Sequence, residues 1–313
     1  NRFKQHDGIN GTDLDYGHLT AVTNRILNTP IPVACNIPNN AVIATYLSSP
    51  SVDLERIAHK LLNETEGMDA SCIQQRFITI CLSNTTYAGC LDNYLPNCAL
   101  VDAQVGDSAK VDYYIHFRAG LFQYLTYLKW FLIDRLLKAN VNLFFIDSDV
   151  VMLCNPWNRE GLFPRYIEDS KYDMICQREV YKKTRLNAGQ MLFFNTNKTN
   201  QLVQMMMDKG QQIVNNSMLE QSLVYHSSKL LDMQVGSFSH HIIASHCWEF
   251  KFNRSEMCTF HANCQTGINQ KIFLMRQAAL MKKECAWDPK VCKGYHILPH
   301  HYENSTATKT TVQ

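Results

Sequence analysis

Short apolar segments alternate with longer amphipathic ones in the first half of this chain, and this alternation constrains its fold most. Apolar runs at residues 41–47, 77–82 and 141–146 have the length and composition of buried β-strands. Leucines at helical spacing predict helices near residues 53–63 and 121–138. A strand–helix–strand–helix–strand order is typical of a mostly parallel sheet covered by helices. We therefore predict an α/β protein.

Weaker patterns continue this order toward the C-terminus. Further strands are predicted near residues 98–101, 174–176 and 191–194, and further helices near residues 201–213 and 218–226. Asn140 is a plausible stop for the long helix before the third strand. The pattern therefore continues the alternation of strands and helices into the second half of the chain.

The domain organisation follows from where the pattern begins and ends. Residues 1–40 are polar and irregular and are interpreted as a stem or an N-terminal wrap. Residues 301–313 are interpreted as a disordered tail. Because no internal repeat or clean linker divides the rest, residues 41–300 are predicted to form a single domain.

Cysteines and glycosylation sequons indicate the compartment. The 12 cysteines are Cys35, Cys72, Cys81, Cys90, Cys98, Cys154, Cys176, Cys247, Cys258, Cys264, Cys285 and Cys292. N-x-S/T sequons begin at Asn10, Asn63, Asn84, Asn197, Asn215, Asn253 and Asn304. Together they favour an oxidising lumen, disulfides and N-glycosylation, and the alternative is a cytosolic protein with free buried thiols. The pairing of the cysteines does not follow from the sequence.

The charge balance excludes two classes of partner. The formal net charge is only +2, and no block of Lys and Arg stands out, so we expect no nucleic-acid footprint and no basic membrane-binding patch. No run of 18 apolar residues is present, so no membrane span is predicted within these residues. Because the chain begins at Asn1, a signal peptide or membrane anchor is expected to have preceded it.

Asp147-Ser148-Asp149 is the first motif that could carry chemistry. It follows directly on the apolar run at residues 143–146, where a predicted strand ends. Neighbouring strand positions face opposite ways, but a turn at the end of a strand lets both carboxylates reach one cation. Ligands of open parallel sheets bind at this edge, and carboxylates suit Mg²⁺ or Mn²⁺, which bind phosphate oxygens. The alternative is a pair of solvated aspartates in a turn.

Further blocks follow in a recognisable order along the chain. They are Lys129 on the long helix, residues 144–157 around the two aspartates, residues 187–194 beginning Asn187-Ala188-Gly189, the pair Glu220-Gln221, and residues 260–264 (Phe-His-Ala-Asn-Cys) with Gly267 and Lys271. This order resembles the nucleotide-diphospho-sugar transferase family, which is related to glycosyltransferase family 77, over roughly residues 41–280. The resemblance implies a GT-A-like, Rossmann-type, disulfide-bonded fold with a mixed, mostly parallel sheet. Residues 41–157 would form a nucleotide-binding half, and residues 158–300 an acceptor half with a C-terminal metal and phosphate segment.

The resemblance also implies a role for each matching residue. Asp147, Asp149 and His261 would bind the metal, and Glu220 and Gln221 would be the catalytic pair near the reacting carbon. The nucleotide-sugar site would be formed by Thr45, Tyr46, Lys129, Ser148, Asn187, Gly189, Gly267 and Lys271. Sugar transfer expels a diphosphate, so a divalent ion and cationic side chains would stabilise charge where it develops. No covalent nucleophile is assigned.

Each assignment has an alternative. His261 could be a core histidine or, with Cys258 and Cys264, a zinc ligand, although a disulfide is the favoured state of these cysteines. Glu220-Gln221 could be an exposed helix pair, and single lysines are usually solvated. Glu220 stands where the family usually has Asp, Ser148 where it often has Ala, and Cys154 where a charged residue is common. His240, His241, His246, His296, His300 and His301 match no metal motif and are interpreted as surface or core residues.

The leading hypothesis is a retaining, metal-dependent glycosyltransferase. It would transfer galactose, xylose or arabinose from a UDP-sugar to a glycan or glycoprotein, with Mn²⁺ or Mg²⁺ as cofactor. It would work in the secretory pathway, in the Golgi lumen as a type II membrane protein or as a secreted protein. The alternatives are a non-catalytic GT-A-like module that binds carbohydrate or nucleotide, and a metal-dependent phosphohydrolase. A phosphohydrolase of this kind would need more carboxylates or histidines around two metal ions than the sequence shows.

Overall fold

A seven-stranded mixed sheet forms the centre of the protein. The computed structural model describes residues 14–65, 69–103, 120–157, 163, 171–178, 186–215, 218–239, 242–245, 256–264 and 267–287. The sheet has the order β10 (Val235–Ser237), β8 (Met174–Arg178), β9 (Leu186–Phe193), β6 (Asn142–Ile146), β2 (Ala41–Leu47), β3 (Phe77–Cys81) and β4 (Cys98–Leu100). Strand β9 runs antiparallel to both of its neighbours, and the other pairs are parallel. The predicted mixed, mostly parallel sheet is therefore confirmed.

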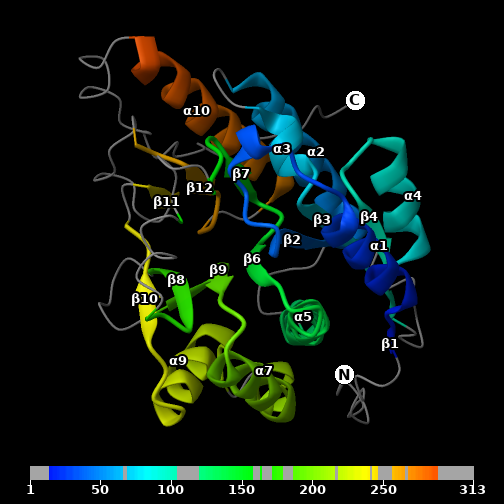
Figure 1. Ribbon diagram of the computed structural model, residues 1–313, viewed down its shortest axis with the longest axis vertical. Coiled ribbons are helices and arrows are strands. Elements are labelled where there is room, and N and C mark those ends of the chain that lie inside the picture. The colour runs from blue at the N-terminus through cyan, green and yellow to red at the C-terminus, as the bar shows by residue number, and fades with distance from the viewer. Residues whose placement is uncertain are drawn as a thin grey trace, which may run out of the picture.

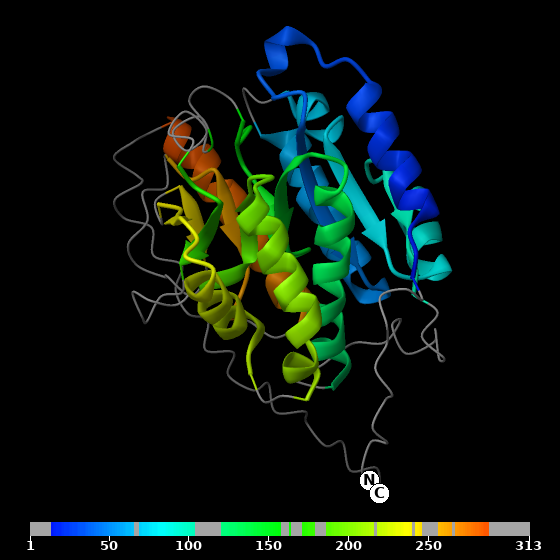
Figure 2. The ribbon, with the colours of Figure 1, turned by 60° about the horizontal axis from the view of Figure 1, so that its bottom comes forward.

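Helices cover both faces of this sheet (Figures 1 and 2). Helices α1 (Gly17–Asn28), α5 (Gly120–Leu137), α7 (Asn197–Lys209) and α9 (Glu220–Leu230) contribute to a large apolar core on one face, and short α8 (Gln211–Val214) adds to it. Helices α2 (Val52–Glu64), α3 (Ala70–Gln74) and α4 (Asn84–Asp92) pack on the other face. Strand residues are buried on both faces, which explains why β2 and β6 are continuous apolar runs rather than alternating ones.

A second, three-stranded sheet forms beside the edge of the large one. It consists of β11 (Ile243–Ser245), β12 (Thr259–His261) and β7 (Val150–Met152), with β12 antiparallel to β7. The last described helix, α10 (Ile268–Trp287), packs against α2 and β12, and Figure 1 shows α10 beside α2. This arrangement brings the C-terminal part of the chain back to the end of β6. A two-stranded pair of β1 (Leu14–Asp15) and β5 (Asp102–Ala103) completes the sheets.

The structure corrects two parts of the sequence interpretation. Residues 17–28, which were expected to be irregular, form α1, because Leu19, Val22 and Ile26 make an apolar stripe that is buried against the sheet. Residues 84–92, where the sequence pattern predicts no helix, form α4. Its N-cap is Ser83, whose side chain accepts a hydrogen bond from Thr86 N. The predicted stop of α5 is confirmed, because Asn140 adopts a left-handed conformation with φ of 59°.

Three disulfides join described residues: Cys35–Cys72, Cys90–Cys98 and Cys154–Cys258. Cys264 is also disulfide-bonded. Because Cys258 and Cys264 are both oxidised, they do not serve as zinc ligands with His261. Cys247, Cys292, the six additional histidines considered above (His240, His241, His246, His296, His300 and His301), and the sequons at Asn10, Asn253 and Asn304 lie outside the described residues.

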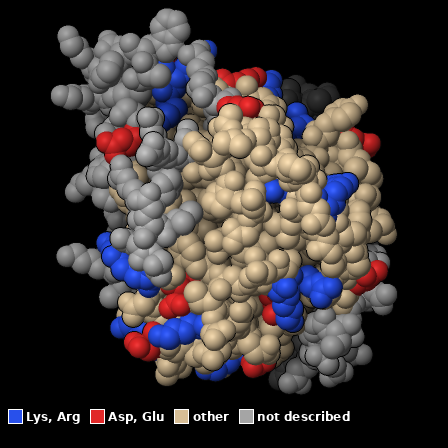
Figure 3. Space-filling model, viewed as in Figure 1, with Lys and Arg blue, Asp and Glu red and all other residues tan. Residues whose placement is uncertain are grey.

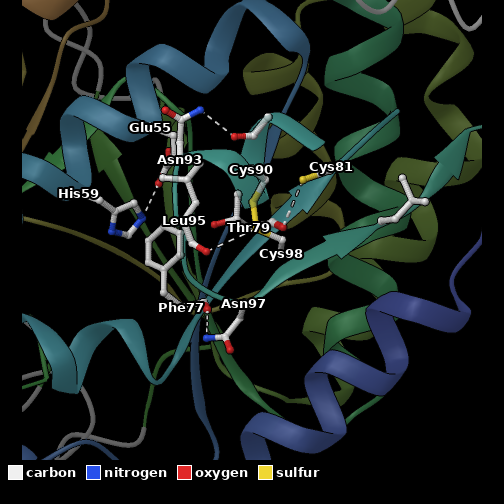
Figure 4. Close-up of a disulfide and its surroundings, with 12 residues drawn as sticks. Glu55, His59, Phe77, Thr79, Cys81, Cys90, Asn93, Leu95, Asn97 and Cys98 are labelled. Atoms are coloured by element: carbon white, nitrogen blue, oxygen red, sulfur yellow. Dashed lines mark hydrogen bonds and ion pairs between the residues drawn. A yellow bond between two sulfur atoms is a disulfide. The ribbon is translucent and has the colours of Figure 1, made fainter. Parts of the chain in front are cut away.

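Two described cysteines, Cys81 and Cys176, are free and buried. Cys81 packs in one small apolar cluster with the Cys90–Cys98 disulfide, and Figure 4 shows it among Glu55, Thr79 and that disulfide. Burial, with the charge of Glu55 adding to it, raises the pKa of the Cys81 thiol to about 12. Burial likewise raises the pKa of Cys176 above its ordinary range. Both thiols are therefore held in the unreactive protonated form.

We expect iodoacetamide at pH 8 to leave Cys81 and Cys176 unmodified in the native protein. At that pH a thiol with a pKa of about 12 carries roughly a thousandfold less thiolate than an ordinary cysteine, and burial restricts access further. Peptide mass spectrometry after labelling measures the result, and the urea-unfolded protein is the positive control. Labelling of either cysteine in the native protein as fast as in urea would contradict this packing.

One face of the protein carries mixed charge. On the face in Figure 3, Lys and Arg are interspersed with Asp and Glu rather than gathered by sign.

Within the described part of the chain, none of the helices combines the length and the apolar character that crossing a bilayer requires.

Candidate active site

The two aspartates lie in a tight turn between β6 and β7. Asp147 follows β6, and its carbonyl accepts a hydrogen bond from Val150 N at 3.1 Å. The amide of Asp147 donates to Gly189 O at 2.8 Å, which ties the turn to β9. The turn interrupts the strand alternation, so the carboxylates of Asp147 and Asp149 reach the same place. The structure thus brings them together as the motif predicted.

His261 is brought to these carboxylates by the small sheet. It is the last residue of β12 and pairs with Val150 of β7. Its Nε2 atom lies 3.1 Å from Asp149 Oδ1 and 4.0 Å from Asp147 Oδ2. One ligand atom from each of the three side chains lies within 4.8 Å of the others. Two carboxylates and an imidazole at this spacing have the chemistry of a site for a Mn²⁺- or Mg²⁺-sized cation.

Lys271, in the first turns of α10, donates a hydrogen bond to Asp149 Oδ2. Asp149 is only 6% exposed. Burial alone would raise the pKa of its carboxyl, but Lys271 and His261 hold that pKa well below its usual range. Asp149 is therefore an anion at every pH at which the protein would work.

Lys129 is a second cation at the site and is almost completely buried. Its Nζ atom, carried by α5, lies 3.0 Å from Ala188 O, 3.3 Å from Asp147 Oδ1 and 3.2 Å from Glu220 Oε1. Burial alone would lower its pKa, but the charges of Asp147 and Glu220 raise it above the ordinary value. Lys129 is thus a permanent charge that joins the aspartate turn to the start of α9.

Glu220 begins α9 and faces the same centre. Trp130 Nε1 donates to Glu220 Oε1 at 3.0 Å, and Lys129 Nζ lies on the same carboxylate. The Glu220 side chain is 12% exposed. Burial raises its pKa to about 7; Lys129 opposes this shift and the charge of Asp147 adds to it. A carboxyl with this pKa is close to balance between its two protonation states at neutral pH.

The Glu220 carboxyl should make the metal-free protein less stable as the pH rises. Its pKa is about 7 in the folded protein and 4.5 in the unfolded chain, so its stabilising contribution is complete below pH 4.5 and lost by about pH 7. This loss corresponds to about 3 kcal/mol. In Glu220→Gln, urea unfolding between pH 4.5 and 7.5 with chelator should lack that decline. The exposed Glu64→Gln is the control, and a decline of equal size in all three proteins would contradict the assignment.

Strand β9 is irregular where it passes the site. Cys176 pairs with Met191 but Gln177 pairs with Asn187, so the ladder between β8 and β9 shifts at this point. Between the two pairs, Ala188 O accepts a hydrogen bond from Lys129 Nζ, and Gly189 N donates one to Asn187 Oδ1 at 2.8 Å. Such irregularities are common beside active sites because they re-aim backbone and side-chain groups.

Position 189 requires a glycine because the His261 side chain lies too close for a Cβ atom there. A Cβ atom at this position would lie 2.2 Å from His261 Cε1 and 2.9 Å from Asp147 Oδ2. Both contacts are shorter than van der Waals distance, so the imidazole or the strand would have to move.

We expect Gly189→Ala to weaken Mn²⁺ binding by roughly tenfold or more, because the displaced ring no longer meets the carboxylates. Overpacking should also cost about 1–3 kcal/mol of folding stability. Electron paramagnetic resonance of free Mn²⁺ and urea unfolding measure the two effects. Gly89→Ala is the matched control, because its Cβ would lie at an ordinary 3.5 Å from Val52 Cγ1. Mn²⁺ binding by Gly189→Ala at the wild-type affinity would contradict this geometry.

Tyr46 and Thr45 are neighbours in β2, so their side chains point to opposite faces of the sheet. Tyr46 packs near Phe145 on the α5 side, and burial raises the pKa of its hydroxyl, with Lys129 opposing and Asp147 adding to the shift. Tyr46 therefore lies near the centre. Thr45 faces the other way and is fully buried, and its hydroxyl has no hydrogen-bond partner among the described residues. The structure does not bring the Thr45 side chain to the site.

Three remaining predicted residues lie around the centre. Ser148 is the partly exposed middle residue of the aspartate turn, and Gln221 is partly exposed in the first turn of α9. Gly267 has a φ of 98°, which favours glycine, and its carbonyl accepts a hydrogen bond from Lys271 N. The sequence did not single out Trp130, which binds Glu220, or Gln177, whose Oε1 lies 2.9 Å from His261 Nδ1.

A family model described as nucleotide-diphospho-sugar transferase matches residues 72–275, about two thirds of the chain. The chain belongs to this family. The matched segment contains both aspartates, Lys129, Glu220, His261 and Lys271. The protein is therefore a glycosyltransferase by family, and the resemblance predicted from the ordered blocks is confirmed. Its relation to glycosyltransferase family 77 stays a prediction.

Solved structures similar to this transferase include three glycosyltransferases. One is a glycosyltransferase involved in glycosylation of the major capsid of PBCV-1 (TM-score 0.47, 10% identity, covering 76% of this chain and 98% of that one). Another is the galactosyltransferase LgtC in complex with donor and acceptor sugar analogues (TM-score 0.47, 11% identity, covering 77% of this chain and 95% of that one). The third is mouse xyloside xylosyltransferase 1 in its apo form (TM-score 0.44, 12% identity, covering 73% of this chain and 99% of that one). No curated protein is similar enough to count as a match.

Proposed function

We propose that this glycosyltransferase is metal-dependent and transfers a sugar from a UDP-sugar to a glycan or glycoprotein. The observation that carries the proposal is the convergence of Asp147, Asp149 and His261 within 4.8 Å, from segments more than a hundred residues apart. These residues would hold Mn²⁺ or Mg²⁺. When bound, the cation would neutralise charge on the diphosphate leaving group.

The electrostatic balance supports a cation. Three carboxylates, from Asp147, Asp149 and Glu220, meet two ammonium groups, from Lys129 and Lys271. The formal charge of these five described side chains is −1 when Glu220 is ionised and His261 is neutral. A bound divalent cation would reverse this sign and so favour an anionic donor at the same edge of the sheet.

The side chains around the cation would divide the remaining work. Lys271 and Lys129, which pair with the two aspartates, would stabilise the departing diphosphate, and Gly267 would let backbone approach it. Glu220 and Gln221 begin α9 beside the carboxylate turn and would contact the reacting sugar, where an anionic Glu220 stabilises positive charge at the anomeric carbon. Asn187, Gly189, Ser148 and Tyr46 would border the donor. Retention of the anomeric configuration is part of the proposal and rests on the family resemblance.

The donor sugar and the cellular compartment complete the proposal. Galactose, xylose and arabinose are the proposed donor sugars. A secretory compartment, the Golgi lumen or the exterior, is supported by the three disulfides and by sequon asparagines that are exposed at Asn63, Asn84, Asn197 and Asn215. A membrane anchor before Asn1 is proposed with the Golgi location.

A donor screen tests the proposed function. The protein is incubated with Mn²⁺ and UDP-galactose, UDP-xylose or UDP-arabinose, and released UDP is measured with and without chelator. We expect release from one donor that is abolished by chelator and by Asp149→Ala but kept by Asp173→Asn. Asp173 is a matched buried aspartate that binds Thr196 and Gln234 at the other end of β8. Binding of UDP-sugars without turnover, even with glycan acceptors, would favour a non-catalytic module, and hydrolysis of generic phosphate esters a phosphohydrolase.

A further inference from the structure

Gln177 makes a contact with His261 that the proposed metal site does not by itself require. Gln177 is 2% exposed in β8, and its Oε1 atom lies 2.9 Å from His261 Nδ1. His261 uses its other nitrogen, Nε2, to face the two aspartates. The two ring nitrogens therefore have different partners, and the partner of one restricts the state of the other.

The orientation of the Gln177 amide follows from its second partner. Its Nε2 atom donates to Ala244 O in β11 at 3.4 Å, and a carbonyl oxygen can only accept. The amide oxygen is thereby left to face His261. Because this oxygen can also only accept, the hydrogen of the contact must be carried by His261 Nδ1.

We propose that Gln177 is a positioning residue that holds His261 as the Nδ1–H tautomer and so leaves its Nε2 lone pair for the cation. The inference rests on the proposed metal site. Metals bind neutral imidazole through the nitrogen without hydrogen, and a fixed partner on the other nitrogen sets both tautomer and ring orientation. Without Gln177, His261 could turn over or carry its hydrogen on Nε2.

The shift in the β8–β9 ladder explains why Gln177 is available. Regular pairing of β8 with β9 ends at Cys176, and Gln177 resumes it only opposite Asn187. The strand irregularity thus carries the Gln177 side chain toward β11 and β12 rather than along the ladder. The same irregularity leaves Gly189 close to His261 Cε1, so the irregular segment positions two residues that approach this imidazole.

Gln190 provides a matched control. It is a fully buried glutamine on the adjacent strand β9, and it also bonds β12, accepting from Thr259 Oγ1 at 2.7 Å. Its amide reaches a residue two positions before His261 and makes no hydrogen bond to a proposed metal ligand among the described residues. Replacing either glutamine by methionine keeps the volume and removes one buried hydrogen bond to β12. Gln177→Met also removes the longer hydrogen bond to Ala244 O in β11.

The decisive experiment compares Gln177→Met with Gln190→Met by titrating Mn²⁺ under electron paramagnetic resonance. We expect Gln177→Met to bind Mn²⁺ roughly 10- to 100-fold more weakly than wild type, and Gln190→Met to bind within about twofold of it. Gln177→Glu should restore binding, because a carboxylate oxygen also accepts from Nδ1–H. Equal affinities in the two methionine variants would overturn the proposal.

A spectroscopic arm separates this inference from the metal site itself. In protein with ¹⁵N-labelled histidine and ¹¹³Cd²⁺ as a diamagnetic probe, the His261 resonance should show a proton on Nδ1 and cadmium coupling at Nε2. Coupling at Nδ1 would overturn the role of Gln177. If wild-type protein binds neither Mn²⁺ nor Cd²⁺, the proposed function fails, and the position of the His261 hydrogen in wild type and Gln177→Met then decides the role of Gln177 alone.

Discussion

Lys129→Met should cost this protein about 3–5 kcal/mol of folding stability and most of its transfer activity. The substitution keeps the buried chain length but removes the charge that Asp147, Glu220 and Ala188 O share. Breaking a buried ion pair from one side is costly because the remaining charge loses its partner in a poorly solvated place. The pKa of Lys129 is raised, so its contribution is present at all pH values below the ordinary lysine pKa and lost only at higher pH. Urea unfolding at pH 7 with chelator measures the loss.

Two comparisons make this expectation specific. Lys198 and Asp232 form an exposed pair at 3.7 Å, so Lys198→Met should cost less than about 1 kcal/mol. In a Glu220→Gln background, Lys129→Met should cost less than in wild type, because one of its two carboxylate partners is already neutral. A loss within about 1 kcal/mol for Lys129→Met alone would contradict the buried network.

Removal of the Cys154–Cys258 disulfide, as Cys154→Ser/Cys258→Ser, should lower the unfolding free energy by about 4–5 kcal/mol. The bond spans 104 residues, and the entropy that a cross-link removes from the unfolded chain grows with the loop it closes. It joins the end of β7 to the start of β12, next to the backbone bond from Leu153 N to Cys258 O at 2.7 Å. Mn²⁺ affinity should fall as well, because these strands carry Asp149 and His261 into contact.

The Cys90–Cys98 disulfide is the internal control for this effect. It spans only 8 residues, so its removal should cost about 2–3 kcal/mol of folding stability. It lies among α4 and β4, away from the turn between β6 and β7 that carries the carboxylates of Asp147 and Asp149 (Figure 1). Mn²⁺ affinity should then stay at the wild-type value. Thermal and urea unfolding of both double variants, with Mn²⁺ titration of each, measures the difference. Equal losses of stability and of metal affinity in the two variants would contradict the proposed role of the longer bridge.

Strong local patterns explain which parts of the fold were predictable. The strands β2 and β6 are buried on both faces, so their sequences are unbroken apolar runs. By contrast, α4 has no apolar stripe and is held by its Ser83 cap and the disulfide of Cys90. Strands β11 and β12 contain only three residues each, too few for a periodic signal. Their positions are set by pairing with distant segments.

The residues of the candidate site also fall into those that the sequence indicates and those that it does not. Asp147 and Asp149 stand at a strand end that the sequence identifies, and the family blocks supplied His261, Lys129 and Lys271. Gln177 and Trp130 act through contacts across 84 and 90 residues, which spacing along the chain cannot reveal. The Thr45 side chain lies apart from this centre. It neighbours Tyr46 in sequence, but strand alternation turns its side chain to the other face of the sheet.

The most direct test of the central claim is a Mn²⁺ titration of wild type, Asp149→Asn and Asp173→Asn under electron paramagnetic resonance, with and without UDP. We predict one Mn²⁺ per chain in wild type and Asp173→Asn, bound more tightly when UDP is present. Asp149→Asn should lose roughly a hundredfold or more of that affinity. Wild-type protein that binds no Mn²⁺ even with UDP, or Asp149→Asn that binds it as wild type does, would contradict a cation held by Asp147, Asp149 and His261.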